Sequence, residues 1–111
     1  MKLNTSQYKL SLYTEDVCED CQILKEKLKE LHIPFENRCI TVDREKGKNS
    51  PQNVANRWEF IDTATEKGHE VIKHTPVMIL EDTSGKKEYY SAGAAFETPS
   101  DAITLLHKYC I

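Results

Sequence analysis

Two cysteines three residues apart, Cys18 and Cys21, are the side chains of this sequence best suited to chemistry. They follow a short β-favouring run, Tyr8 to Tyr13, and precede a segment with helical periodicity. This context predicts that Cys18 lies at a helix N-terminus, where free N–H groups and the helix dipole favour a thiolate. Cys21, one helical turn further on, would then lie close enough to form a disulfide with Cys18. The spacing therefore predicts a dithiol–disulfide site.

Four acidic residues surround this pair in the sequence: Glu15, Asp16, Glu19 and Asp20. Two charges ~7 Å apart interact by roughly 0.6–1.2 kcal/mol at an effective dielectric constant of about 40–80. Because one pKa unit corresponds to about 1.36 kcal/mol, several such acids would raise the pKa of Cys18 by about one unit. A destabilised thiolate favours the disulfide, so the sequence predicts a reducing couple that donates electrons.

The same acids would favour a partner with a basic surface over an anionic one. The alternative is that acids at a helix start only complement the helix dipole. For Asp20 alone this simpler explanation is sufficient. For four acids on both sides of the cysteines, we expect a role in partner choice.

The composition is typical of one small globular domain, with 39% hydrophobic and 30% charged residues in a chain of 111. A net charge of −3 argues against nucleic acids and membrane surfaces as partners. The sequence has no apolar run of membrane-spanning length and no signal-peptide core, so a cytoplasmic location is expected. We expect residues 1–111 to form a single monomeric domain, with residues 1–7 as a loose arm. Dimerisation through Cys110 stays open.

Hydrophobic periodicity predicts the elements that position the cysteines. A strand is expected over residues 8–13, an amphipathic helix over about 14 residues after the cysteines, and a second strand over residues 35–42. A strand–helix–strand unit of this length predicts two parallel strands.

The second half of the chain adds a helix, a hairpin and a last helix. The helix begins at Ser50-Pro51, and its expected buried stripe is Val54, Trp58, Ile61 and Ala64 or Thr65, with Trp58 as a core anchor. Strands are expected over residues 77–80 and 87–91, joined by a hairpin turn at residues 82–85. Thr98 and Asp101 predict the cap of the last helix. The order β-α-β-α-β-β-α predicts an α/β fold with a four-stranded mixed sheet flanked by helices.

This order, with Cys-x-x-Cys after the first strand and Thr75-Pro76-Val77 before the third, resembles the glutaredoxin branch of the thioredoxin fold over about residues 8–110. The resemblance implies a cis peptide bond before Pro76, and binding of a peptide or glutathione by the main chain at Thr75 and Pro76. The alternative is that Pro76 merely opens a strand, where its missing N–H does no harm. The resemblance also implies substrate contacts at Tyr13 and Gly93.

Two segments depart from the usual glutaredoxin pattern. Glu15 stands where glutaredoxins usually have a lysine that binds a glutathione carboxylate. The segment around Gly93 replaces the Gly-Gly turn that holds the γ-glutamyl end of glutathione, and is similar to the Ser-Gly-Phe turn of the glutaredoxin-like donors to ribonucleotide reductase. Those donors are reduced by thioredoxin reductase.

The resemblance therefore implies a dithiol oxidoreductase without a tightly bound cofactor. It would reduce a protein disulfide, such as that of ribonucleotide reductase, and would take electrons from thioredoxin reductase more readily than from glutathione.

Three alternatives stay open. The protein could be a glutathione-dependent glutaredoxin, with glutathione as co-substrate. Cys18 and Cys21 could instead bind Zn²⁺ or an iron–sulfur cluster, although no second Cys-x-x-Cys or Cys-x-x-His supports zinc, and no metal ligand is assigned. A regulatory protein could also keep the fold without turning over.

Three further side chains receive simpler interpretations. Cys39 and Cys110 are expected to be buried thiols, because a structural disulfide set does not fit a chain without a secretion signal. His74, two residues before Pro76, is interpreted as a loop side chain rather than a proton shuttle.

Overall fold

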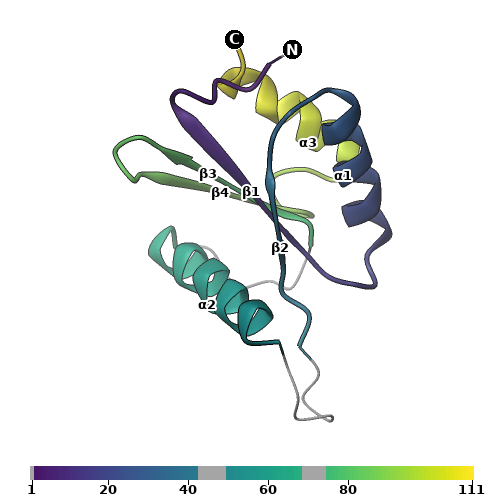
Figure 1. The fold of residues 1–111 in the computed structure, drawn as a ribbon, viewed down its shortest axis with the longest axis vertical. Coiled ribbons are helices and arrows are strands. Elements are labelled where there is room, and N and C mark those ends of the chain that lie inside the picture. Colours follow the sequence, from purple (N-terminus) through teal and green to yellow (C-terminus); the bar gives the residue numbers. More distant parts are fainter. Residues whose placement is uncertain (1, 43–49, 69–74) are drawn as a thin grey trace.

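The structure is a computed structural model that describes residues 2–42, 50–68 and 75–111, and its centre is a four-stranded sheet (Figure 1). The strands are β1 (Tyr8–Thr14), β2 (Glu36–Cys39), β3 (Val77–Asp82) and β4 (Lys87–Ser91), in the order β2-β1-β3-β4. β1 pairs in parallel with β2 and antiparallel with β3, and β3 pairs antiparallel with β4. The predicted mixed α/β architecture and the parallel first pair are confirmed.

Among the described residues, three α-helices cover the two faces of this sheet: α1 (Glu19–Glu30), α2 (Pro51–Glu66) and α3 (Pro99–Leu106), the last continuing into a 3-10 turn at His107–Tyr109. α1 and α3 lie side by side on one face, and α2 lies on the other (Figure 1). No helix in the described part of the chain is long and apolar enough to cross a membrane.

Each face of the sheet has its own hydrophobic core, because side chains of a strand alternate between faces. Leu10 and Leu12 of β1 pack with the helices α1 and α3, whereas Tyr13 of the same strand packs with α2. We call the core beneath α1 and α3 the first core and the core beneath α2 the second core. β3 alternates likewise, with Met78 in the first core and Val77 in the second core. β1 therefore runs through the middle of the molecule, and its last residues lead directly into the cysteine loop.

α1 ends where the sequence predicts. His32 adopts a left-handed conformation with φ of 56°, and the Ile33 N–H donates to Leu28 O at 2.9 Å. This pattern closes the helix before Pro34. The buried stripe of α1 is Cys21, Leu24 and Leu28, so the second cysteine belongs to the core-facing side of the helix.

The expected buried stripe of α2 is wrong at Trp58 and right at Ala64, which is 0% exposed, and Ile61 packs partly buried against the core under α2. Trp58 is 62% exposed, whereas Phe60, about 200° away around the helix, is 1% exposed and fills the second core. The face turns this way because it also buries a polar residue, Asn56, whose Nδ2 donates to Cys39 O at 3.0 Å. Apolar spacing gives no weight to Asn56, so it places Trp58 in the predicted stripe and leaves Phe60 out of it.

The second strand is shorter than predicted, since β2 ends at Cys39 rather than at residue 42. From the last residue of β2 onward, the carbonyl groups of three successive residues accept hydrogen bonds from side chains of α2, which holds this segment against the helix. The bonds join Asn56 Nδ2 to Cys39 O (3.0 Å), Arg57 Nη1 to Ile40 O (3.1 Å) and Asn53 Nδ2 to Thr41 O (3.0 Å).

The expectation of a loose N-terminal arm is also wrong. Leu3 is 4% exposed and belongs to the first core, and it forms an isolated bridge with Cys110. The Ile111 N–H donates to Lys2 O at 2.7 Å, so the two ends of the chain lie together (Figure 1). A single leucine among polar residues carries no periodic signal, and the segment that buries it is more than 100 residues away in the sequence.

The hairpin and the last helix follow the sequence closely. β4 spans the predicted residues 87–91, and Gly85 takes a φ of 87° in the turn before it. Thr98 and Asp101 form the predicted capping box at the start of α3.

Candidate dithiol–disulfide site

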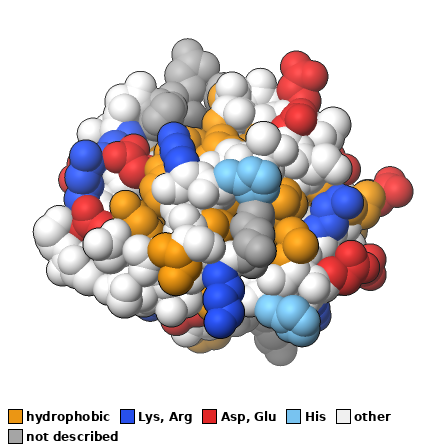
Figure 2. Space-filling model, turned by 90° about the horizontal axis from the view of Figure 1, so that it is seen from above, with side chains coloured by type: hydrophobic (Ala, Val, Ile, Leu, Met, Phe, Trp, Pro, Cys, Tyr) orange, Lys and Arg blue, Asp and Glu red, His pale blue; other side chains and the backbone are white. Residues whose placement is uncertain are grey.

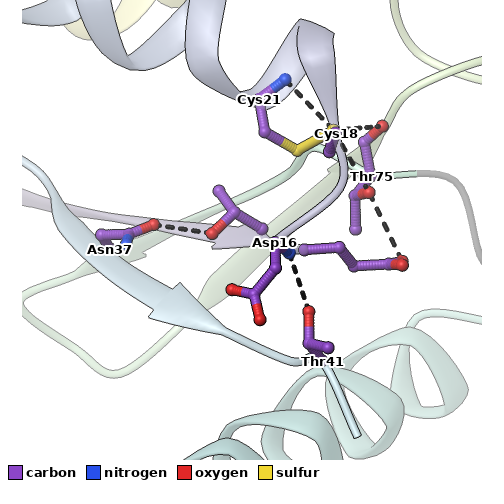
Figure 3. The surroundings of a disulfide bond; sticks show 8 residues. Asp16, Cys18, Cys21, Asn37, Thr41 and Thr75 are labelled. Carbon is purple, nitrogen blue, oxygen red and sulfur yellow. Dashed lines mark hydrogen bonds between the residues drawn. A yellow bond between two sulfur atoms is a disulfide. The ribbon is translucent and has the colours of Figure 1, made fainter. Parts of the chain in front are cut away.

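Cys18 and Cys21 form a disulfide at the start of α1, with their Cα atoms 5.2 Å apart (Figure 3). Cys18 is the N-cap residue, in an extended conformation with φ of −149° and ψ of 102°. The Cys21 N–H donates to Cys18 Sγ at 3.1 Å, so this sulfur occupies the position that a Ser or Asp oxygen takes in other helix caps. The predicted placement of Cys18 at a helix N-terminus is confirmed.

The two sulfur-bearing residues differ in accessibility. Cys18 is half-buried, whereas Cys21 is 0% exposed beneath the first turn of α1. A partner molecule can therefore approach Cys18 and not Cys21. The residue before the pair, Val17, is 98% exposed.

The segment Thr75-Pro76 packs directly against Cys18 from a position 57 residues further along the chain. Its peptide bond is cis, as the resemblance implies. Cys18 Sγ lies 3.8 Å from the Thr75 carbonyl oxygen and 3.6 Å from Thr75 Oγ1 (Figure 3). Pro76 O in turn accepts from the Ala92 N–H at 3.1 Å, which connects the segment to the end of β4.

The four acids take different positions around the loop. Glu15 is half-buried, and its Oε1 accepts from Thr75 Oγ1 at 3.4 Å. Asp16 is exposed, and its N–H donates to Thr41 Oγ1 at 2.8 Å (Figure 3). Glu19 and Asp20 are exposed in the first turn of α1. None of the four forms an ion pair with another described residue, so their negative charge is not neutralised within that part of the chain.

Tyr13 lies in the core rather than beside the disulfide. Its ring is 1% exposed and packs 6.0 Å, centroid to centroid, from Phe60 under α2. Burial raises the pKa of Tyr13, and the neighbouring carboxylate of Glu59 raises it further. The position of this ring does not support its expected contact with a substrate.

Gly93 lies in a tight turn after β4, with φ of 84°. Successive N–H groups of this turn donate inside the chain: Gly93 to Phe96 O at 2.8 Å, and Ala94 and Ala95 to Ser91 O at 3.2 and 2.9 Å. The turn therefore already uses the amides that a bound carboxylate would need.

The remaining cysteines are half-buried rather than fully buried. Cys110 Sγ donates to Leu106 O at 3.2 Å, and burial raises the pKa of this thiol. Cys39 Sγ donates to Asp16 Oδ1 at 3.4 Å, next to the cysteine loop. The sequence did not predict that Cys39 lies next to the site, because this contact depends on the strand register that pairs Thr14 with Cys39. His74 lies outside the described residues.

A groove of about 430 Å³ lies at the other end of β1, between the N-terminal segment and the start of β2, and Leu3, Tyr8 and Phe35 help to line it. Hydrophobic side chains gather in the middle of the face seen in Figure 2, at the end of the molecule that carries both termini. This groove is separate from the cysteine loop, which follows the opposite end of β1.

No protein-family model matches the sequence, and no curated protein is similar enough to be matched. Within the described residues, no three His, Cys, Asp or Glu side chains are grouped so that they could hold a metal ion. The structure shows a small α/β domain whose Cys18–Cys21 disulfide is compatible with a thioredoxin-like fold and with redox activity.

Proposed function

We propose that this protein is a dithiol–disulfide oxidoreductase of the glutaredoxin branch of the thioredoxin fold, and that it donates electrons to a protein disulfide. One observation carries the proposal: a half-exposed Cys18 at the start of α1 is disulfide-bonded to a buried Cys21 and lies against Thr75. Thiol–disulfide exchange needs this asymmetry, because the sulfur of one cysteine must reach the partner disulfide. The sulfur of the other cysteine needs to reach only the first cysteine.

The reaction begins with the reduced dithiol. The Cys18 thiolate attacks one sulfur of the partner disulfide, which breaks that bond, forms a mixed disulfide and releases one partner thiolate that is protonated from solvent. Cys21 loses its proton and attacks Cys18 Sγ, releasing the second partner thiolate. Two electrons pass to the partner, and the product is the Cys18–Cys21 disulfide seen in the structure.

The sheet order supports a thioredoxin-like topology. A parallel β1–β2 pair joined through α1, followed by an antiparallel β3–β4 hairpin and α3 on the α1 face, is the arrangement that the sequence resemblance implies. The cis bond before Pro76 and the closeness of Thr75 to Cys18 belong to the same pattern.

Three features favour a protein over glutathione as the partner of this site. Glu15, an acid, stands where glutaredoxins have a glutathione-binding lysine. The amides of the Gly93 turn are engaged in hydrogen bonds within the chain. The carboxylates around Cys18 would repel an anionic tripeptide and attract a basic protein surface. Ribonucleotide reductase is a candidate acceptor, and thioredoxin reductase is the proposed source of electrons.

The experiment is to oxidise the protein and supply two reducing systems in parallel. One contains thioredoxin reductase and NADPH, and the other contains glutathione, glutathione reductase and NADPH. We expect NADPH oxidation linked to disulfide reduction in the first system, and at least tenfold slower reduction in the second. Faster reduction by glutathione would assign the protein to the glutathione-dependent glutaredoxins.

The control variants use the cysteines of the chain. Cys18→Ser should abolish reduction in either system, whereas Cys110→Ser should leave it unchanged, because Cys110 lies at the far end of α3. Failure of both systems with the wild-type protein, together with a stable Cys18–Cys21 disulfide, would favour a regulatory protein that does not turn over.

A further inference from the structure

The hydroxyl group of Thr75 lies between two acceptors. Thr75 Oγ1 is 3.4 Å from Glu15 Oε1 and 3.6 Å from Cys18 Sγ. The three groups come from the end of β1, the N-cap of α1 and the segment before β3, so only the folded chain brings them together.

A hydroxyl group carries one hydrogen, so Thr75 can donate to Glu15 or to Cys18 but not to both at once. Hydrogen bonds to an ionised acceptor are roughly twice as strong as those between neutral groups. While Cys18 is a disulfide or a neutral thiol, the Glu15 carboxylate is therefore the better acceptor and holds the hydrogen. The hydroxyl oxygen then presents a lone pair, not a hydrogen, to Cys18 Sγ.

The situation changes when Cys18 becomes a thiolate. The anionic sulfur can accept a hydrogen bond from the Thr75 hydroxyl only if that hydroxyl stops donating to the Glu15 carboxylate. One of the two anions therefore always lacks this hydrogen bond. The Thr75 carbonyl oxygen, 3.8 Å from the sulfur, cannot replace it because it is an acceptor. The Cys21 N–H at 3.1 Å is the helix-cap donor that remains for the thiolate in either case.

We propose that Glu15 is a positioning residue that acts on Cys18 through the Thr75 hydroxyl, by holding the hydrogen that would otherwise stabilise the thiolate. The inference rests on the proposed function, and it separates Glu15 from the other acids of the loop. Asp16, Glu19 and Asp20 act on the sulfur through their charge, and Asp16 faces Thr41 and Cys39 instead of Thr75.

The test measures the pKa of Cys18 in the reduced protein, from the pH dependence of its alkylation in a Cys39→Ser, Cys110→Ser background. We expect Glu15→Gln to lower this pKa by about one unit, a tenfold larger thiolate fraction below the pKa. Asp20→Asn, which removes one charge without touching Thr75, should lower it by less. This readout needs no partner or reductase, so it can succeed or fail independently of the proposed function.

A double-mutant cycle isolates the hydroxyl-mediated part of the effect. With Thr75→Val, which removes the hydroxyl, the Glu15→Gln shift should fall to the size of the Asp20→Asn shift. The matched cycle of Asp20→Asn with Thr75→Val should be additive. Thr75→Ser keeps the hydroxyl and should restore the full Glu15→Gln shift. His74 is present in every variant of both cycles.

Two results would overturn the inference: additive effects of Glu15→Gln and Thr75→Val, or equal shifts from Glu15→Gln and Asp20→Asn in the wild-type background. If Thr75→Val does not fold, as judged by circular dichroism, Thr75→Ala takes its place, since it also lacks the hydroxyl and Thr75→Ser remains its hydroxyl-bearing counterpart.

Discussion

Cys18 Sγ receives opposing influences from its immediate neighbours. The Cys21 N–H donates to it and favours the thiolate, as helix-terminal amides do in reactive cysteines. The Thr75 carbonyl oxygen and the surrounding carboxylates act in the other direction. Under the proposed function, this balance, rather than the cysteine spacing alone, would determine how reducing the dithiol is.

The difference in exposure between Cys18 and Cys21 leads to a testable prediction. Under the proposed function, Cys21→Ser should accumulate a mixed disulfide between Cys18 and a protein substrate, because this variant lacks the buried cysteine proposed to resolve that intermediate. Non-reducing electrophoresis and mass spectrometry of the trapped adduct provide the measurement.

Cys18→Ser is the matched control for this trapping experiment. It should trap nothing, since Cys21 is 0% exposed and out of reach of a protein partner. An adduct through Cys21 in that variant would contradict the assignment of Cys18 as the attacking residue.

Among the elements, α2 shows most clearly how a helix face is chosen. It places Phe60 between Tyr13 and Tyr89, with the Phe60 and Tyr89 rings nearly parallel and their centroids 6.4 Å apart. On the same helix, Asn56 and Arg57 donate hydrogen bonds to the carbonyl groups of the last residue of β2 and of the residue after it. α2 therefore stabilises the edge of the sheet through polar contacts as well as through its apolar core.

Two large aromatic residues on α2 allow a matched prediction. Phe60→Ala should lower the free energy of unfolding by about 3–5 kcal/mol, because it leaves a cavity in the second core. Trp58→Ala should change it by no more than about 0.5 kcal/mol, since the Trp58 side chain is largely in solvent. Urea denaturation of both variants measures the difference. A larger loss for Trp58→Ala than for Phe60→Ala would show that the opposite face of α2 is buried.

At the scale of the whole molecule, the two ends of the chain are joined opposite the cysteine loop. Leu3 enters the core that α1 and α3 share with the sheet, and the Asn4 N–H donates to Tyr109 O at 3.0 Å. The first residues thus close the end of the domain that carries the termini, while α1 and the Thr75 segment form the site at the other end of β1.

Loss of the contact between the N-terminal segment and the core should lower the stability of the protein. Leu3→Ala should lower the free energy of unfolding by about 2–5 kcal/mol through loss of a buried side chain. Thr5→Ala, a change at an exposed position of the same segment, should leave it within about 0.5 kcal/mol of wild type. Equal denaturation midpoints for Leu3→Ala and wild type would mean that the arm is loose after all.

The sequence by itself determined the features that depend on neighbouring residues. The alternation in β1, the capping box at Thr98, the bounds of β4 and the position of Cys18 at a helix start all follow from interactions within a few residues. Such local signals were sufficient to predict the order of the helices and strands and the pairing of Cys18 with Cys21.

Only the tertiary structure decided which side chains meet across the chain. The burial of Leu3, the outward turn of Trp58 and the contact of Thr75 with both Glu15 and Cys18 depend on packing between distant segments. Each of these three features involves a polar side chain or a single apolar residue, and neither produces a periodic hydrophobic pattern in the sequence. The cysteine pair can therefore be predicted from the sequence, whereas only the fold brings Thr75 and Glu15 next to Cys18.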